Sequence, residues 1–349
     1  MNLLLNLLKN FSINRGGFRM KAVVHAGQAG VEGLAVREIE DFQPGEGEVR
    51  VKLKTAGLNH RDLFVLVRHK PTDPPLVIGS DGAGIVEAVG EGVTGVKLGD
   101  EVVVNPSLGW KENSDAPPEG FEILGLPFHG TFAEHVVVPA ENVAPKPEYL
   151  TWEEAGVLSL AALTAYRALF TQGQVREGMK VLIPGIGSGV ATLLLQFAKA
   201  AGATVYVTSR SENKCQKALE LGADMAFDSN EDWSLALGGE KMDLVIECVG
   251  AATFNKSLKQ LRPGGTIVTF GASAGDVVEF NLRDFFYGQY RLFGSTLGSG
   301  EEYREMLEFV EKHQIRPVVD TMYSLEEYAE AFKRMENAEQ LGKIGFYIK

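Results

Sequence analysis

The feature that most constrains the fold is a short apolar strand that leads into a glycine-rich turn and then into a long helix. The strand is Val181–Ile183, the turn is Pro184-Gly185-Ile186-Gly187-Ser188-Gly189, and the helix extends to about Ala201. Glycines permit the tight turn and let backbone amides approach a phosphate at the start of the helix. A plain glycine turn is the alternative, but the place between a strand and a helix favours a dinucleotide site. The residues predicted to contact the dinucleotide are Gly185, Gly187, Ser188, Gly189 and Val190.

The segment around this turn alternates strands with helices. Thr151 and Glu154 form a capping box, which predicts a helix that begins there and continues to about Phe170. The alternation that follows predicts a parallel sheet with helices on both faces, so the fold class is α/β with a doubly wound Rossmann domain over residues 150–299. Further strands are predicted at 204–208, 243–247 and 266–270, and helices at 189–201 and 213–221.

Residues 20–149 differ in character, because they contain short strands broken by glycine turns. Strands are predicted at 20–24, 48–54, 101–104 and 132–138, with an irregular excursion at 108–127. Helices near 301–313 and 324–337 and a strand at 344–348 are predicted for the tail. A length of 349 residues favours two domains. Residues 1–19 are expected to be an upstream extension, because a clean strand pattern begins at Met20. A secretory signal is not expected there, because the apolar start is short and no basic leader precedes it.

The composition narrows the class of partner. The net charge of -12 and the isoelectric point near 5.1 provide no basic field to attract nucleic acid or an anionic membrane. The chain has only two cysteines, Cys215 and Cys248, which excludes a disulfide framework and a four-cysteine zinc lobe. We therefore expect a cytoplasmic protein that acts on a small molecule.

The end of the second Rossmann strand indicates which nicotinamide cofactor binds. NAD-binding units usually place a carboxylate there to hold the ribose hydroxyls. This chain has Ser209-Arg210, with Lys214 one helical turn later. A hydroxyl and a guanidinium can bind a 2′-phosphate, which a carboxylate would repel. We therefore expect NADP (NADPH), although solvated surface cations are the alternative for Arg210 and Lys214.

The chain resembles the medium-chain dehydrogenase/reductase superfamily over nearly all of residues 20–349. The landmarks are Gly57-Leu58-Asn59-His60-Arg61-Asp62-Leu63, Gly79-Ser80-Asp81-Gly82-Ala83-Gly84, Gly99-Asp100-Glu101-Val102, the glycine turn, Asp243–Gly250, Leu261–Gly265 and Gly342-Lys343-Ile344. The resemblance implies a GroES-like, β-barrel-type catalytic domain formed by residues 20–149 and completed by 300–349. It also implies that the active site lies between this domain and the Rossmann domain, with Val249, Gly250, Gly271 and Lys343 contacting the cofactor.

Three positions depart from the zinc-using members of this family. Asn59 stands where those members carry a cysteine ligand, Ser80 stands where they carry a histidine, and Leu160 stands near their third ligand. Asparagine and serine are poor zinc ligands and leucine is none, so the resemblance is to the zinc-independent, quinone oxidoreductase-like branch. The alternative is a metal site rebuilt from His60, Asp81 and His129.

Losing zinc changes which chemistry is feasible. Alcohol oxidation needs the hydroxyl deprotonated as hydride leaves, which zinc promotes as a Lewis acid. A conjugated electrophile asks less, because hydrogen-bond donors can stabilise the oxyanion that forms when it accepts hydride. We therefore predict NADPH-dependent hydride transfer to a quinone or an α,β-unsaturated carbonyl, with Asn59, Arg61, Ser80 and Tyr166 as the catalytic donors. The alternatives are that Asn59 is a turn residue, that Arg61 forms a surface ion pair with Asp62, and that Ser80 only braces its loop. Asp81 is expected to be a structural brace rather than a base.

Two other functions stay open. One is an alcohol or aldehyde dehydrogenase that uses NAD(P) with an atypical or absent metal, and the other is an NADPH-binding protein with a structural or regulatory role. Arg291–Leu297 is suited to pair as an edge strand across a two-fold axis, so a homodimer or homotetramer is expected. The excursion at 108–127 either lines the substrate entrance or supports subunit contacts.

Overall fold

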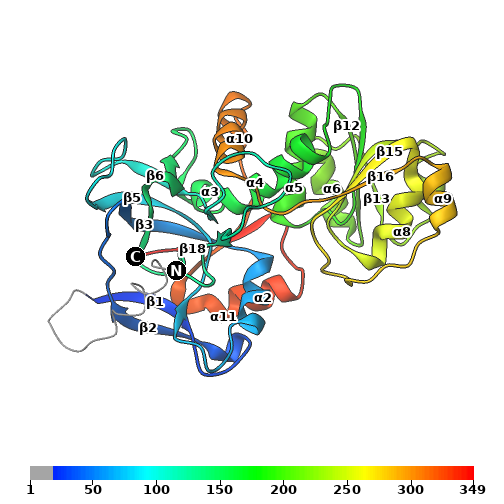
Figure 1. The fold of residues 1–349 in the computed structure, drawn as a ribbon. Coiled ribbons are helices and arrows are strands. Elements are labelled where there is room, and N and C mark those ends of the chain that lie inside the picture. The colour runs from blue at the N-terminus through cyan, green and yellow to red at the C-terminus, as the bar shows by residue number, and fades with distance from the viewer. Residues whose placement is uncertain (1–18) are drawn as a thin grey trace.

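The computed structural model describes residues 19–349 and contains a six-stranded parallel sheet beside a second domain rich in antiparallel strands (Figure 1). The order of the parallel sheet is β13-β12-β11-β14-β15-β16, and every neighbouring pair is parallel. This order is that of a doubly wound Rossmann domain, so the α/β prediction is confirmed. The strands are β11 (Lys180–Ile183), β12 (Thr204–Ser209), β13 (Met225–Asp228), β14 (Met242–Glu247), β15 (Leu261–Thr269) and β16 (Arg291–Gly294). The helices between them are α5 (Gly189–Ala200), α6 (Glu212–Glu220), α7 (Trp233–Ala236), α8 (Ala251–Gln260) and α9 (Leu282–Tyr287).

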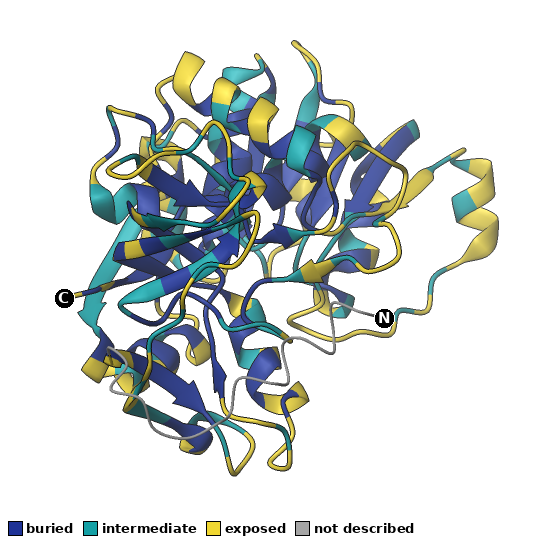
Figure 2. Ribbon diagram, turned by 60° about the vertical axis from the view of Figure 1, so that its left-hand side comes forward, coloured by how far each residue is buried: buried dark blue, intermediate teal, exposed yellow. Residues whose placement is uncertain are grey.

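The central strands are apolar on both faces, which is why helices cover both sides of the sheet. Val181 and Ile183 belong to one hydrophobic cluster, which includes the buried side of α5. Leu182 lies between them in sequence and packs into a second cluster with Phe254 of α8. Because successive side chains of a strand point to opposite faces, each face needs its own layer of helices. Figure 2 shows buried strands between helices whose outer faces are exposed.

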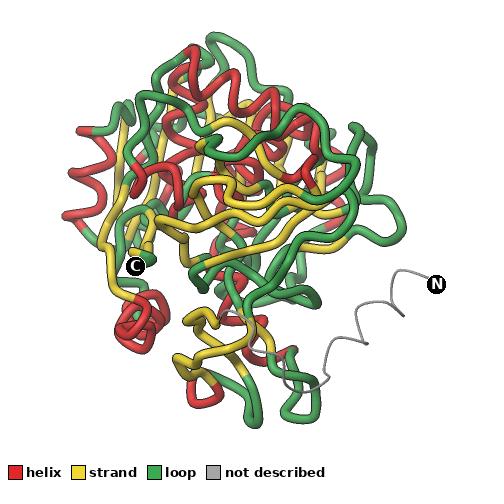
Figure 3. The backbone as a smooth tube through the Cα atoms, turned by 90° about the vertical axis from the view of Figure 1, so that its left-hand side faces the viewer, coloured by secondary structure: helices red, strands yellow, loops and turns green. Residues whose placement is uncertain are grey.

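The second domain is built from both ends of the described chain, which are drawn in blue and red in Figure 1. Figure 3 turns this domain toward the viewer, with its strands in yellow. Its larger sheet has the order β10-β6-β5-β3-β18-β17, with β9 also paired to β3, and its smaller sheet has the order β2-β1-β4. The late strand β18 pairs with β3 in antiparallel fashion and with β17 in parallel fashion. The strands are β1 (Arg19–His25), β2 (Leu34–Glu40), β3 (Glu48–Leu58), β4 (Leu76–Val77), β5 (Asp81–Val89), β6 (Glu101–Val104), β9 (His135–Pro139), β10 (Val143–Pro145), β17 (Val319–Ser324) and β18 (Lys343–Tyr347). This is the GroES-like architecture that the resemblance implied; its predicted boundaries in the sequence stay predictions.

Helices and short turns complete this domain and join it to the parallel sheet. The helices are α2 (His60–Arg68), α3 (Trp152–Gly156), α4 (Ser159–Tyr166), α10 (Gly300–Lys312) and α11 (Tyr328–Glu336). The short turns are η1 (Val31–Gly33), η2 (Ala140–Asn142), the π-helical η3 (Arg167–Gln172) and η4 (Leu325–Glu327). None of the helices within residues 19–349 combines the length and apolarity needed to cross a bilayer.

The prediction of one continuous helix from Thr151 to Phe170 is wrong. The capping box is present, because Thr151 Oγ1 accepts from Glu154 N and Glu154 Oε2 accepts from Thr151 N. The helix nevertheless breaks after Gly156, and α4 begins at Ser159. Near the break, Leu160 N donates to the Asp81 carboxylate at 2.7 Å. A tertiary acceptor thus takes a backbone donor that local helix propensity would assign to the preceding turn.

The predicted strand at 132–138 begins later than expected. Phe132 accepts a bond from Val23 N, Ala133 bridges Ala22, and only from His135 onward does the segment pair with β3 as β9. The segment is extended throughout but crosses from the smaller sheet to the larger one. The excursion at 108–127 is irregular as predicted, holding the short strand β8 (Glu122–Ile123), which pairs with β7 (Ser107–Leu108). Apart from Arg19, which lies in β1, the predicted extension at 1–19 lies outside the described residues.

Candidate active site

The glycine turn after β11 has the geometry that a dinucleotide requires. Gly185 has φ 71° and Gly187 has φ 151°, both in the region that favours glycine. A Cβ on Gly185 would lie 2.5 Å from Val249 Cγ2, and one on Gly189 would collide with the side chain of Lys343. Ser188 caps α5 by accepting from Ala191 N at 3.1 Å. The backbone at Gly189 and Val190 begins the helix, so this end of α5 fits a pyrophosphate.

The end of β12 presents cations and hydroxyls. Ser209 is buried and accepts from Ser211 N at 3.1 Å, while Arg210 is exposed. The side chain of Lys214 crosses the turn, because a Cβ on Gly187 would lie 3.1 Å from Lys214 Cδ. Burial lowers the pKa of Lys214, and the positive charges of Arg210 and Arg334 lower it further while Asp320 opposes them. The ammonium of Lys214 donates to Ala338 O at 2.7 Å, so it is already bonded to the protein.

A buried carboxylate fixes the turn after β14. Glu247 Oε1 accepts from Val249 N at 2.8 Å and from Gly250 N at 3.1 Å. The hydroxyls of Thr253 and Ser257 donate to the same carboxylate. Sequence reasoning missed Glu247, although an acidic residue at the end of an apolar strand was a usable signal.

Gly271 lies next to this turn, where a Cβ would meet Cys248 O at 2.7 Å. The predicted cofactor residues Val249, Gly250 and Gly271 thus meet at the carboxyl ends of β14 and β15, the edge where open parallel sheets bind ligands.

Asn59, Asp81 and Lys343 form one buried cluster in the catalytic domain. Lys343 Nζ donates to Asn59 Oδ1 at 2.5 Å, to Asp81 Oδ2 at 3.0 Å and to Leu58 O at 3.0 Å. Asn59 Nδ2 donates to Asp81 Oδ2 at 3.0 Å. The side chains of Lys343 and Asp81 are 3% and 0% exposed. Lys343, predicted to contact the cofactor, therefore directs its ammonium into this cluster, while its neighbour Gly342 bonds to Gly187 O through its backbone.

Ser80 and Arg61 form a second group beside this cluster. Arg61 Nη1 donates to Ser80 Oγ at 2.7 Å and to Leu124 O at 3.0 Å, and Ser80 Oγ donates to Leu124 O at 2.7 Å. The side chain of Arg61 is 21% exposed. Within residues 19–349, no protein acceptor bonds its Nε or Nη2. Arg61 is thus held through one nitrogen and keeps donors for another molecule.

Tyr166 is placed with a different set of residues. Its hydroxyl donates to Glu305 at 3.4 Å, and its ring packs on Phe170 and Phe309. Burial raises the pKa of Tyr166 to about 12. The structure brings Asn59, Ser80 and Arg61 close to Asp81 but gives Tyr166 no bond to them, so its predicted catalytic role has no supporting contact.

The residues at the family's metal position do not fit a zinc ion. The amide of Asn59 and the hydroxyl of Ser80 are hydrogen-bonded to protein groups, and Leu160 offers no ligand atom. The described chain from Arg19 onward contains no group of three His, Cys, Asp or Glu side chains arranged to hold a metal ion. His129 stacks on Phe42 and accepts from Val77 N, and the ring of His60 contacts Phe64. The alternative site from His60, Asp81 and His129 is therefore not assembled.

The alternative that Arg61 and Asp62 form a surface ion pair is wrong, because Asp62 is buried. Its carboxylate is 0% exposed, lies 4.0 Å from Arg61 Nη1, and accepts from Asn59 N at 2.8 Å. Burial raises the pKa of Asp62 to about 6, against the opposing charge of Arg61 and the bond from Asn59 N. Asp62 thus fixes the start of α2, where Asn59 is the N-cap and Arg61 lies in the first turn.

Comparison with known proteins agrees with this architecture. Residues 45–148 match the family model described as "Alcohol dehydrogenase GroES-like domain", and residues 189–312 match "Zinc-binding dehydrogenase". A zinc-type alcohol dehydrogenase-like protein of Schizosaccharomyces pombe is 36% identical over 341 residues, which cover 93% of this chain and 98% of that one. Crotonyl-CoA reductase of Streptomyces avermitilis is 32% identical over 306 residues, covering 78% of this chain and 68% of that one.

Solved structures give the same result. A crystal structure of an NAD-dependent alcohol dehydrogenase matches with a TM-score of 0.89 and 38% identity, covering 95% of this chain and 100% of that one. A crotonyl-CoA carboxylase/reductase in complex with NADP matches with a TM-score of 0.85 and 25% identity, covering 96% and 97%.

Replacing Asp62 tests how much its buried negative charge lowers the free energy of unfolding. The folded chain holds the Asp62 proton up to about pH 6, whereas an unfolded aspartate releases it near pH 4, so ionisation makes wild-type stability fall as pH rises between these values. The free energy of unfolding of Asp62→Asn should therefore rise by roughly 2 kcal/mol relative to that of wild type as the pH increases from 4 to 6. Chemical denaturation at each pH measures this difference. Asp284→Asn, an exposed aspartate at the third residue of α9, controls for the substitution itself. A stability difference that stays constant from pH 4 to 7 would contradict the assignment.

Proposed function

The chain belongs to the medium-chain dehydrogenase/reductase superfamily, and we propose that it is an NADPH-dependent reductase that delivers hydride to a quinone or an α,β-unsaturated carbonyl without catalytic zinc. The observation that carries the proposal is the hydrogen bonding of the residues at the position where zinc-using relatives hold their metal. There, Asn59 and Ser80 are bound to protein groups, and the neighbouring Arg61 keeps unbonded N–H donors. A site of this kind can stabilise an oxyanion by hydrogen bonds but does not offer ligands to a divalent ion.

Arg61 is the principal donor in this mechanism. NADPH, when bound between the domains, supplies the hydride. As the electron pair moves onto the substrate oxygen, the guanidinium of Arg61 faces the developing negative charge, and a proton then arrives from water. Ser80 and the Leu124 carbonyl orient Arg61 through Nη1. Asn59 differs from its predicted role, because its amide is already bonded at both ends, so we assign it to positioning.

The relatives support a conjugated substrate and also keep a second candidate open. Relatives named crotonyl-CoA reductase and acryloyl-coenzyme A reductase reduce, by their names, conjugated thioesters. Other relatives are named alcohol dehydrogenases, which favours alcohol or aldehyde oxidoreduction as the second candidate. Cofactor binding without turnover is the remaining alternative. The hydrogen-bonded state of the metal position is what makes us prefer the reductase.

Turnover assays separate these functions. We expect oxidation of NADPH by 1,4-quinones or enones at the same rate before and after chelator treatment, and little reduction of NADP with alcohols. Arg61→Met should lower kcat about 100-fold with a small effect on KM, because its donors act on charge that develops during reaction.

Arg68→Met, an exposed arginine at the other end of α2, is the matched control and should keep wild-type kcat. Strict dependence on added zinc would overturn the metal-free mechanism. Tight NADPH binding with no acceptor reduced would favour the non-catalytic role.

The preference for NADPH rests on Arg210 and Lys214. Arg210→Ala should raise KM for NADPH about 10-fold to 100-fold and leave KM for NADH nearly unchanged, since only NADPH carries the charged group that Arg210 would bond. Lys217→Ala removes an exposed cation from α6, the helix that follows Arg210 and carries Lys214, and is the control. Equal losses for both cofactors would show that Arg210 does not read the 2′-phosphate.

We further propose a cytoplasmic homodimer that pairs its parallel sheets through β16. All four residues of β16 are exposed at the sheet edge, and nearby α9 exposes Leu282 by 70% and Tyr287 by 72% (Figure 2). Exposed apolar groups beside an unpaired edge are typical of an interface. Light scattering should give twice the chain mass, or four times for the tetramer, and Tyr287→Lys with Leu292→Lys should shift it toward the monomer. A monomeric wild type would refute this assembly.

A further inference from the structure

Two histidines of the catalytic domain form a buried pair that the proposed mechanism does not use. His25 ends β1 and is 0% exposed, and His69 is the C-cap of α2 and is 4% exposed. Their Nδ1 atoms lie 2.8 Å apart, which is hydrogen-bond distance. Each ring turns its other nitrogen toward a backbone oxygen. His25 Nε2 lies 3.2 Å from Gly30 O, and His69 Nε2 lies 2.9 Å from Pro74 O, so the pair connects β1 and the end of α2 with two loops.

A count of protons shows that the neutral pair cannot satisfy all three contacts. A carbonyl oxygen only accepts, so each Nε2 needs a proton to bond, and one of the two facing Nδ1 atoms needs another. Three bonds therefore require three protons, whereas two neutral imidazoles have two. The contact with Gly30 O is longer than the contact with Pro74 O, so we assign the missing proton to His25 Nε2. A third proton would complete the bonds but would give the pair a positive charge.

The protein places no negative charge against this pair. Within residues 19–349 the histidine ion pairs are those of His135, and neither His25 nor His69 takes part in one. In the sheet, His25 is paired with the apolar residues Leu34 and Leu76. The charged residues nearest in sequence are exposed or bonded elsewhere, namely Glu32, Arg68, Lys70 and Asp73, whose carboxylate accepts from Lys70 N.

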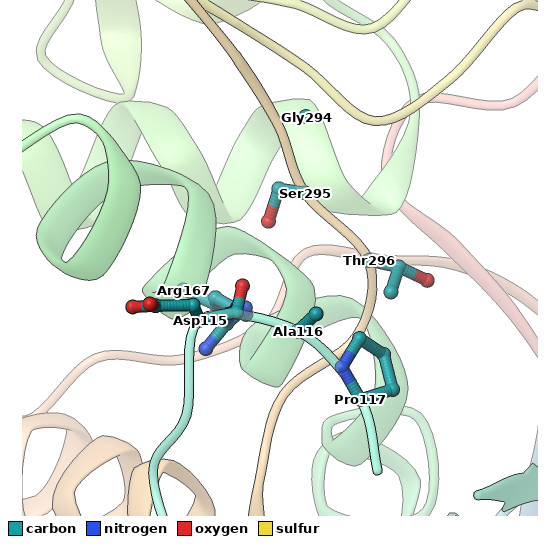
Figure 4. Close-up of a pocket in the computed structure, with 7 residues that line it drawn as sticks. All are labelled: Asp115, Ala116, Pro117, Arg167, Gly294, Ser295 and Thr296. Carbon is teal, nitrogen blue, oxygen red and sulfur yellow. The ribbon is translucent and has the colours of Figure 1, made fainter. Parts of the chain in front are cut away.

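Other buried cations of this protein differ from the pair in this respect. The ammonium of Lys343 is bonded to Asp81, and the guanidinium of Arg167 is bonded to Glu302. Figure 4 shows Arg167 with its neighbours from residues 115–117 and 294–296. A buried charge is tolerated when it is paired, so a charge on the histidine pair would be costly.

This difference determines how the pair responds to pH. Burial lowers the pKa of His25, the charge of His69 lowers it further, and the contact with Gly30 O opposes both. A solvated histidine titrates near pH 6.5. His25 therefore takes up a proton more readily once water reaches the ring, and acidification favours any form in which the ring is uncovered.

The segment that covers the ring is the loop of residues 26–33, which contains η1. A Cβ on Gly33 would lie 2.6 Å from His25 Nε2, so this loop packs directly on the imidazole. Gly30 N donates to Leu66 O at 3.0 Å, which holds the loop against α2. Gly30 and Val31 also line a depression of about 290 Å³ together with residues of α2 and with Ser273, which follows β15. A shift of the loop would thus change a wall that faces the Rossmann domain.

We propose that the His25–His69 pair is an acid-sensitive latch on residues 26–33. At neutral pH the uncharged pair lies beneath the loop, and the loop keeps its contacts with β1 and α2. As the pH falls below the ordinary titration range of histidine, a proton on His25 adds a buried charge, and the loop opens to hydrate it. The inference is independent of the proposed reductase function, because it is tested in protein without cofactor.

Hydrogen exchange at about pH 5 and about pH 7.5, corrected for the intrinsic effect of pH, tests the latch. Protection of the amides in residues 26–33 should fall about two-fold to ten-fold at the lower pH, as weakening of one hydrogen bond predicts. His25→Gln should abolish this difference, because its amide can donate to Gly30 O at every pH. His313→Gln, at the exposed C-cap of α10, is the matched control and should keep the difference.

Asp62, at the other end of α2, has its pKa raised to about 6 and titrates in the same range. A pH effect on the loop that persists in His25→Gln would therefore be assigned to Asp62 and would overturn the latch.

The imidazole nitrogens of the wild type give a second test that needs no variant. Nitrogen-15 chemical shifts at about pH 7.5 should show His25 protonated at Nδ1 only and His69 protonated at Nε2 only. At about pH 5, His25 should carry both protons. A ring of the pair that carries both protons at the higher pH, or loop protection that does not change with pH, would overturn the inference.

Discussion

The carboxylate of Asp81 is the point on which the catalytic domain depends. It is fully buried and accepts from the ammonium of Lys343, the amide of Asn59 and the backbone N–H of Leu160. A buried ion is tolerated only when it is paired and hydrogen-bonded, so these three partners must stay in place together. They come from the last strand, the start of α2 and the start of α4. One charge thus fixes three distant parts of the chain.

The same arrangement connects the catalytic domain to the cofactor turn. Gly342 precedes Lys343 and donates its N–H to Gly187 O at 2.8 Å. A Cβ on Gly189 would collide with the side chain of Lys343, so the lysine stem packs directly on the start of α5. The strand that supplies the buried ammonium therefore also contacts the turn where the pyrophosphate is expected. A movement of one domain relative to the other would therefore alter both the buried Asp81 cluster and the glycine turn before α5.

The contrast between Asn59 and Arg61 shows how neighbouring residues on α2 acquire different tasks. Asn59 caps the helix and has its amide committed to Lys343 and Asp81, whereas Arg61 uses one nitrogen for Ser80 and Leu124. Preorganised donors that need no rearrangement are those that stabilise developing charge best. The proposed function follows from this difference in remaining hydrogen-bonding capacity, which residue type alone does not reveal.

Strand periodicity and turn chemistry are local properties, so the Rossmann sheet and the glycine turn could be predicted from the residues alone. The departures at Asn59, Ser80 and Leu160 were identified through the resemblance to a known family. The sequence did not predict the break between α3 and α4, since the competing acceptor, Asp81, lies far away in sequence. It also did not predict that Lys343 bonds to Asp81, that Arg167 pairs with Glu302, or that Tyr166 packs on Phe309. These contacts depend on the fold, because a buried polar side chain must bond to a partner and the fold determines which partners lie within reach.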